Sequence, residues 1–98
     1  MRNMIIYKYI IPLESAQELI LPKHSVILSV KEQHNRIVLY ALADYNLLNT
    51  VVFDIRVCDT GEVIDIEGFV FLGTVKLAGG RLMYHIFYKE MGEIYENN

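Results

Sequence analysis

The chain has 98 residues, 53% of them hydrophobic and 21% charged, and its mean hydropathy is +0.26. A chain of this length forms one domain, and this apolar content excludes intrinsic disorder, which needs low hydrophobicity and high net charge. Nine Lys and Arg against 12 Asp and Glu give a formal net charge of −3, which argues against a binder of nucleic acid or of anionic membranes.

The apolar residues favour strands over helices. Ile and Val together number 21, against 15 for Leu and Ala, and there are seven Tyr. Branching at Cβ crowds a helix and suits a pleated sheet. The single cysteine excludes an internal disulfide framework, and with no signal peptide it predicts a protein of the reducing cytoplasm.

The first half of the chain predicts four strands separated by turn residues. Residues 4–11 form the first, which Pro12 ends because proline cannot donate to a ladder. Residues 17–21 are interpreted as a short second strand, with a helix of at most about two turns as the alternative for 13–21. It is expected to form a hairpin with residues 26–30, and residues 36–43 follow as the fourth strand.

The second half predicts three further strands and one short return strand. Residues 51–58 alternate, with Phe53, Ile55 and Val57 on one face. Residues 62–66 follow the turn at Asp59-Thr60-Gly61 as the short strand. Residues 69–77 and 82–89 form the clearest hairpin, joined at the glycine pair 79–80, where φ > 0 costs little.

Together these elements predict an all-β fold: a single small antiparallel β-sandwich or open barrel of about seven strands. Residues 1–90 form the domain, and residues 91–98 are a tail that is frayed or docked on a partner. Three strands, 4–11, 37–43 and 82–88, are apolar on both faces. A domain of this size has one core, so the surplus apolar surface predicts a homo-oligomer.

Residues that could carry catalysis do not form a recognisable constellation. His24, His34, His85 and Cys58 have no metal-ligand spacing, and the serines lack the context of a nucleophile elbow. We therefore expect no metal, no cofactor and no enzymatic activity. Asp59 beside Cys58 raises the pKa of the thiol rather than activating it. The acidic residues 59–67 are interpreted as a solvated edge, which protects a sheet against edge pairing.

Arginine and tyrosine recur together at the starts of two strands. Arg36 precedes Tyr40 by four residues, so both project from one face of a strand, and Arg81 precedes Tyr84. A guanidinium beside an aromatic face can hold a nucleotide-like anion, through phosphate contact and base stacking. The candidate ligand-binding residues are therefore Arg36, Tyr40, Arg81, Tyr84 and His85, although arginines at strand ends with tyrosines in an oligomer interface explain the same pattern. For His85, a hydrogen-bonded core or interface histidine is the competing interpretation.

Three blocks of the sequence carry a family resemblance: IIYKYIIPL, ILSVKEQHNRIVLYALAD and FLGTVKLAGGRLMYHIFYKE. They resemble a family of small phage and prophage proteins that share an I-Y-K-Y start, an L-S-V-x-x-Q segment leading to [WY]-A-L-x-D, and an L-G-T hairpin closing on [WY]-H-[IV]-F. The family provides no activity to transfer. The resemblance implies a phage protein made in a bacterial cytoplasm, where small β-rich oligomers include counter-defence proteins that sequester nucleotide immune signals.

Three functions remain open at this point. The first is a non-enzymatic oligomer that sequesters a nucleotide-like host immune signal between subunits. The second is an inhibitor or accessory factor that binds a host enzyme through an exposed sheet face or edge. The third, an enzyme acting on nucleotides, needs a convergent acid, base or metal that the sequence does not offer. Neither nucleic acid nor a membrane is expected as a partner.

Overall fold

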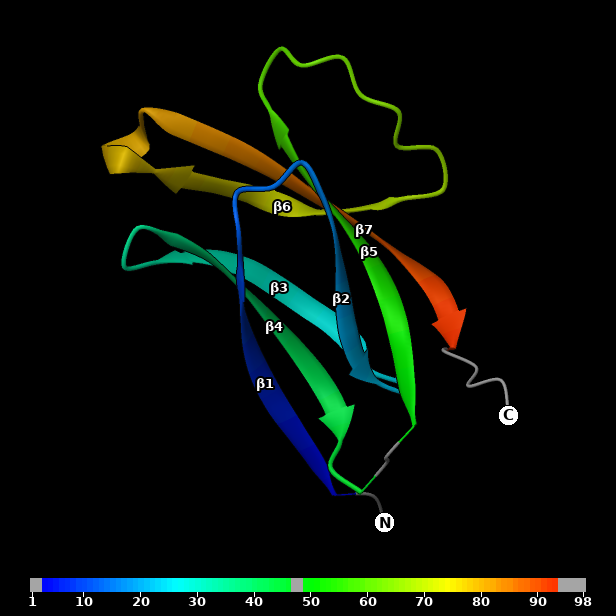
Figure 1. The fold of residues 1–98 in the computed structure, drawn as a ribbon. Coiled ribbons are helices and arrows are strands. Elements are labelled where there is room, and N and C mark those ends of the chain that lie inside the picture. Colours follow the sequence, from blue (N-terminus) through cyan, green and yellow to red (C-terminus); the bar gives the residue numbers. More distant parts are fainter. Residues whose placement is uncertain (1–2, 47–48, 94–98) are drawn as a thin grey trace.

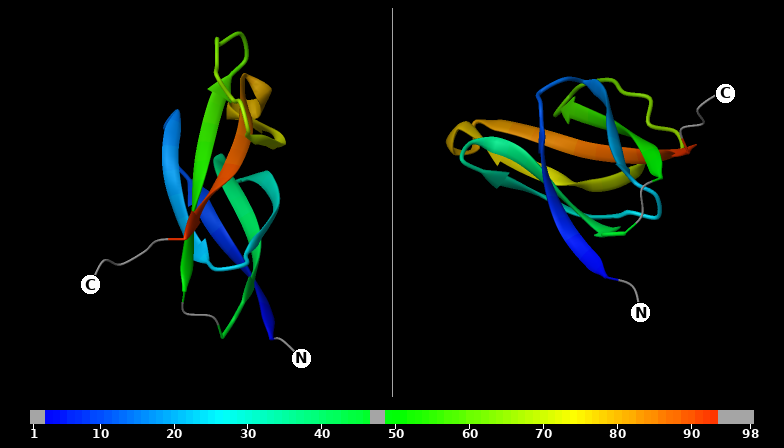
Figure 2. Two further views of the ribbon diagram at one scale, coloured as in Figure 1. Left: turned by 90° about the vertical axis from the view of Figure 1, so that its right-hand side faces the viewer. Right: turned by 60° about the horizontal axis from the view of Figure 1, so that its bottom comes forward.

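A computed structural model of the chain describes residues 3–46 and 49–93. Within them lie seven strands: β1 (Met4–Ile11), β2 (Ala16–Pro22), β3 (Val26–Gln33), β4 (Arg36–Asp44), β5 (Thr50–Asp59), β6 (Val70–Leu77) and β7 (Leu82–Glu93). They form two antiparallel sheets, β1–β4–β3 and β2–β5–β7–β6, that pack face to face as a β-sandwich (Figures 1 and 2). The all-β prediction is confirmed, in its sandwich form.

The core lies between the sheets and is built by alternation along the strands. Ile37, Leu39 and Ala41 of β4 point into it, and Phe53, Ile55 and Val57 of β5 meet them from the other sheet. Each of these six side chains is buried, as expected for the period of two residues in a strand. The predicted face of residues 51–57 is therefore confirmed.

The predicted hairpin of residues 17–21 with 26–30 is wrong. Residues 17–21 are a strand, not a helix, but β2 pairs with β5 while β3 pairs with β4, so the turn at 23–25 crosses from one sheet to the other. Within that turn, Ser25 donates its backbone N–H to the carbonyl of Pro22. Lys23 donates its backbone N–H to the carbonyl of Asn49, which precedes β5. Because the hydrogen bonds of this turn do not involve pairing between β2 and β3, the turn residues alone do not predict a hairpin.

The predicted short strand at 62–66 is also wrong. β5 and β6 both pair with β7 and therefore run parallel, so the chain must travel back along the sheet between them. Residues 60–69 make this return as a crossover loop, defined here by those residues (Figure 1). Its carboxylates close turns: Glu62 accepts from Asp59 N–H, and Asp65 accepts from Glu67 N–H.

The predicted glycine hairpin is confirmed. Leu77 pairs with Leu82, and Ala78–Gly80 form a single 3-10 turn in which Gly79 and Gly80 have φ of 68° and 91°. β7 runs to Glu93 rather than ending at residue 89, so the start of the predicted tail is strand. The rest of that tail, residues 94–98, lies outside the described residues.

Candidate functional site

The outer surface of the three-stranded sheet is the most distinctive surface of the described molecule. By register, the following residues share it and define what we call the apolar–cationic face: Met4, Ile6, Lys8, Ile10, Val26, Lys31, Arg36, Val38, Tyr40 and Leu42. Met4, Ile6, Ile10 and Val26 are large apolar residues that remain exposed there. Contiguous exposed apolar area on a small protein marks an interaction surface.

The exposed charge on this face is positive, although the chain as a whole is acidic. Lys8, Lys31 and Arg36 are exposed on it. The carboxylate that the register places on the same side is Asp44, which is only 9% exposed and accepts a hydrogen bond from Asn46 N–H. The face therefore offers cations without a competing exposed acid, which favours an anionic or acidic partner.

Arg36 and Tyr40 project from one face, as the spacing of four residues predicts. Lys8 lies directly opposite Tyr40 on the neighbouring strand, and its Nζ reaches 3.5 Å from Gln33 Oε1. Val38 lies between Arg36 and Tyr40 on the face and is 2% exposed, because neighbouring side chains cover it. The hollow here holds only about 50 Å³ and is lined by Lys8, Ile10, Gln33, His34, Arg36 and Val38, without Tyr40. Ligand pockets hold about 300–1,000 Å³. One subunit thus presents a surface here, not a nucleotide pocket.

Arg81, Tyr84 and His85 do not join that face. Arg81 lies at the hairpin, where its Nε donates to the Ala78 carbonyl at 3.0 Å. Tyr84 is half-buried and packs against the core cluster. His85 points to the outer side of the other sheet, with Nε2 2.7 Å from Thr60 Oγ1 and Nδ1 2.9 Å from Thr74 Oγ1. Arg36 and Tyr40 therefore share one face, whereas Arg81, Tyr84 and His85 lie elsewhere, and His85 joins β6, β7 and the crossover loop.

One contact between turns brings the two predicted arginines to the same end of the sandwich. Asn35, in the turn before Arg36, accepts the backbone N–H of Ala78 at 2.8 Å through its Oδ1. Arg81 follows in the hairpin and donates its own N–H to the Ala78 carbonyl. This bond joins the two sheets at their turns and was not predictable from sequence, because it spans 43 residues.

A family described as "Domain of unknown function (DUF7352)" matches residues 2–96. The chain belongs to this family. No curated protein and no solved structure matches the chain. The family carries no described activity, so any functional argument starts from the surfaces of the fold.

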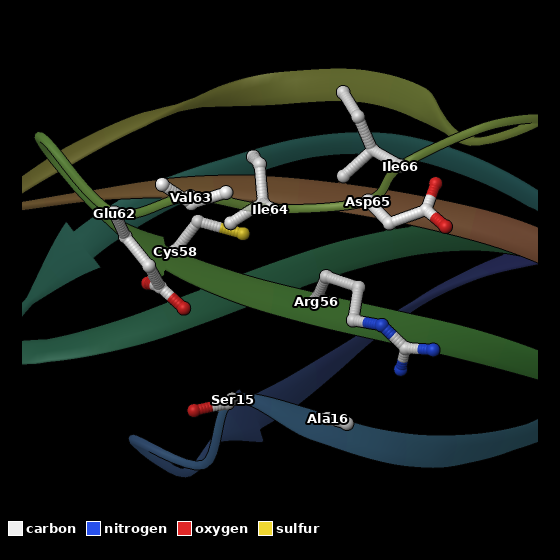
Figure 3. Close-up of a pocket in the computed structure, with 9 residues that line it drawn as sticks. All are labelled: Ser15, Ala16, Arg56, Cys58, Glu62, Val63, Ile64, Asp65 and Ile66. Carbon is white, nitrogen blue, oxygen red and sulfur yellow. The ribbon is translucent and has the colours of Figure 1, made fainter.

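The second sheet differs because the crossover loop covers part of its outer surface. Ile64 and Ile66 of the loop lie over Cys58 and Arg56 of β5, and the hollow between them encloses about 210 Å³ (Figure 3). The Arg56 guanidinium is 5.0 Å from the centre of the Phe69 ring and 2.8 Å from Asp54 Oδ1. Sequence reasoning missed this hollow because it expected residues 62–66 to be a strand.

Cys58 is the nucleophilic group in that hollow, and its surroundings suppress it. The thiol points outward from the sheet, yet Cys58 is 4% exposed. Burial raises its pKa, the Glu62 carboxylate raises it next, Arg56 opposes them, and Asp59 adds a smaller increase. The predicted effect of Asp59 has the right sign, but burial and Glu62 act more strongly. A raised pKa lowers the thiolate fraction at neutral pH.

Between residues 3–46 and 49–93 the structure holds no group of three or more His, Cys, Asp or Glu side chains arranged for a metal ion. In that same part of the chain, no helix has the length and apolar character needed to cross a bilayer.

Proposed function

We propose that this protein is a non-enzymatic binding protein whose contact surface is the apolar–cationic face. The observation that carries the proposal is the combination of exposed Met4, Ile6 and Val26 with Lys8 and Arg36 on one outer sheet surface. Apolar area supplies affinity once it is dehydrated, and cations of one sign select the partner and speed encounter.

A protein with an acidic, partly apolar surface fits this face better than a small molecule does. The face is the outer surface of a sheet, and the hollow on it between Lys8, Arg36 and Val38 holds only about 50 Å³, too little for a nucleotide. In the phage setting implied by the three sequence blocks, the partner would be a host enzyme that this protein inhibits or assists.

A nucleotide-like anion is the second candidate, and the shared face of Arg36 and Tyr40 favours it. The guanidinium can contact a phosphate while the ring stacks on a base. Since one subunit provides no enclosing wall there, the ligand would lie between two copies. A protein of this kind would sequester an immune signal without turning it over.

Capture from bacterial lysate on immobilised protein tests the first candidate. We expect Arg36→Glu to reduce capture of the bound protein at least about tenfold, because it places an acid where the partner's acid docks. Lys76→Glu is the matched control, since Lys76 is an exposed cation on the outer side of β6 in the other sheet. That variant should retain capture, and capture by wild type should fall as salt is raised.

Calorimetric titration with cyclic dinucleotides, cyclic ADP-ribose and NAD tests the second candidate. Binding to wild type that falls about ten- to hundredfold in Arg36→Ala would favour nucleotide sequestration. Equal lysate capture by Arg36→Glu, Lys76→Glu and wild type, with no nucleotide bound, would contradict the proposed use of this face.

A further inference from the structure

The outer edge of β1 is a continuous unpaired strand edge, and we propose that a second copy of this chain pairs with it antiparallel. The Asn3 carbonyl accepts from Tyr45 N–H, which continues the β1–β4 register one residue beyond the Met4–Asp44 pair. Alternation along an antiparallel ladder then directs the backbone groups of residues 5, 7, 9 and 11 to β4. The N–H and C=O groups of Met4, Ile6, Lys8 and Ile10 point to the free edge.

The other three sheet edges in the described structure carry features that discourage pairing. β3 has a register shift between Ile27 and Ser29, and β6 has one between Phe71 and Gly73. β2 ends at Pro22, which has no N–H to donate. β1 pairs over all eight residues with no register shift and no proline. Long, regular, apolar edges are the ones that recruit another strand.

The sequence of β1 identifies the second copy as the occupant. Residues 5–11 read I-I-Y-K-Y-I-I, which is the same in both directions about Lys8. Antiparallel self-pairing centred on Lys8 sets Ile6 opposite Ile10 and Tyr7 opposite Tyr9 of the second copy. A two-fold axis needs a self-complementary surface of this kind, and apolar and aromatic pairs directly opposite each other stabilise a ladder.

The central Lys8 pair sets the strength and register of this contact. Two lysines directly opposite each other destabilise a ladder. The side chain of Lys8 reaches over its own sheet to Gln33 Oε1, which draws the ammonium away from the free edge. The resulting dimer is reversible, and it joins two three-stranded sheets into one six-stranded sheet with a continuous apolar–cationic face. The dimer enlarges the proposed binding surface, whatever the identity of the partner.

Sedimentation velocity of purified protein over a wide concentration range tests the pairing. We expect a monomer–dimer equilibrium, with the dissociation constant raised about ten- to hundredfold in Ile6→Pro, which removes a free-edge donor from each copy. Ile20→Pro is the matched control: Ile20 is 55% exposed against 59% for Ile6, and its N–H also points to a free edge, that of β2. A monomer at all concentrations, or equal weakening by the two prolines, would overturn the proposal.

A charge-swap mixture tests the register without relying on a proline. Unlabelled wild type is mixed with equimolar ¹⁵N-labelled Lys8→Glu, and the dimers are resolved by native mass spectrometry. Pairing centred on Lys8 brings opposite charges together only in the mixed dimer, so it should exceed the statistical half. A statistical distribution would overturn the register. If Arg36→Glu loses lysate capture but still forms the dimer, partner binding by the face and pairing of β1 are separate properties.

Discussion

At the scale of single residues, neighbouring elements determine how each side chain behaves. Cys58 faces outward on β5, and the crossover loop covers it. His85 also faces outward and is held by Thr60 and Thr74. Alternation predicts the face of each residue, and it places Arg36 and Tyr40 together correctly. It does not predict what lies over that face, because the covering loop arrives through long-range topology.

The raised pKa of Cys58 gives a test at this scale. The folded state favours the neutral thiol more than the unfolded state does. Well below the pKa of the unfolded state the thiol is neutral in both states, so its ionisation does not change the free energy of unfolding there. The free energy of unfolding then falls as the pH rises above about 8.5. Burial and the neighbouring Tyr7 also raise the pKa of Tyr9, which adds a similar decline at higher pH. We expect Cys58→Ser to show a flatter decline than wild type in urea denaturation between about pH 7.5 and 9.5. Parallel pH profiles for the two proteins would contradict the assignment.

At the scale of elements, local sequence predicts where the strands lie but not which strands pair with each other. β-Branched runs bounded by Pro12, Pro22 and the glycine pair at 79–80 predict the strands to within a few residues. The same signals wrongly predicted a hairpin of β2 with β3, since the turn at 23–25 is satisfied by its own groups. The turn signal at Asp59-Thr60-Gly61 wrongly predicts a short return strand at residues 62–66. Only the parallel relation of β5 and β6 shows that the chain needs a return path there.

The bond between the two turns gives a test at the scale of elements. Asn35→Gly removes the acceptor for Ala78 N–H and keeps the backbone conformation, because glycine tolerates the φ of 59° at that position. We expect it to lower the free energy of unfolding by about 0.5–1.5 kcal/mol. His34→Gly is the control, since His34 has a φ of 52° in the same turn. The prediction fails if both glycines change stability equally in urea denaturation.

At the scale of the molecule, the two sheets differ in what covers them. The outer surface of β5 and β7 lies partly under residues 60–69 of the same chain. Within residues 3–46 and 49–93, no such loop covers the apolar–cationic face, which explains part of the surplus of apolar residues in the sequence. Within the doubly apolar strand β4, Val38 needs no partner because its neighbours already cover it. Exposed apolar residues remain on β1 and at Val26, the surface for which we propose a partner, and also on the second sheet, at Val70, Phe71, Leu82, Met83 and Met91.

Site-specific photo-crosslinking in bacterial lysate tests the use of that face most directly. Benzoylphenylalanine is placed at Val26, on the face but away from the β1 edge, or at Phe71 on the other sheet; these residues are 53% and 55% exposed. We predict a discrete crosslinked partner protein from position 26 that is absent from position 71 and is lost in the Arg36→Glu background. Crosslinks of equal yield from both positions, or from position 71 alone, would contradict the account.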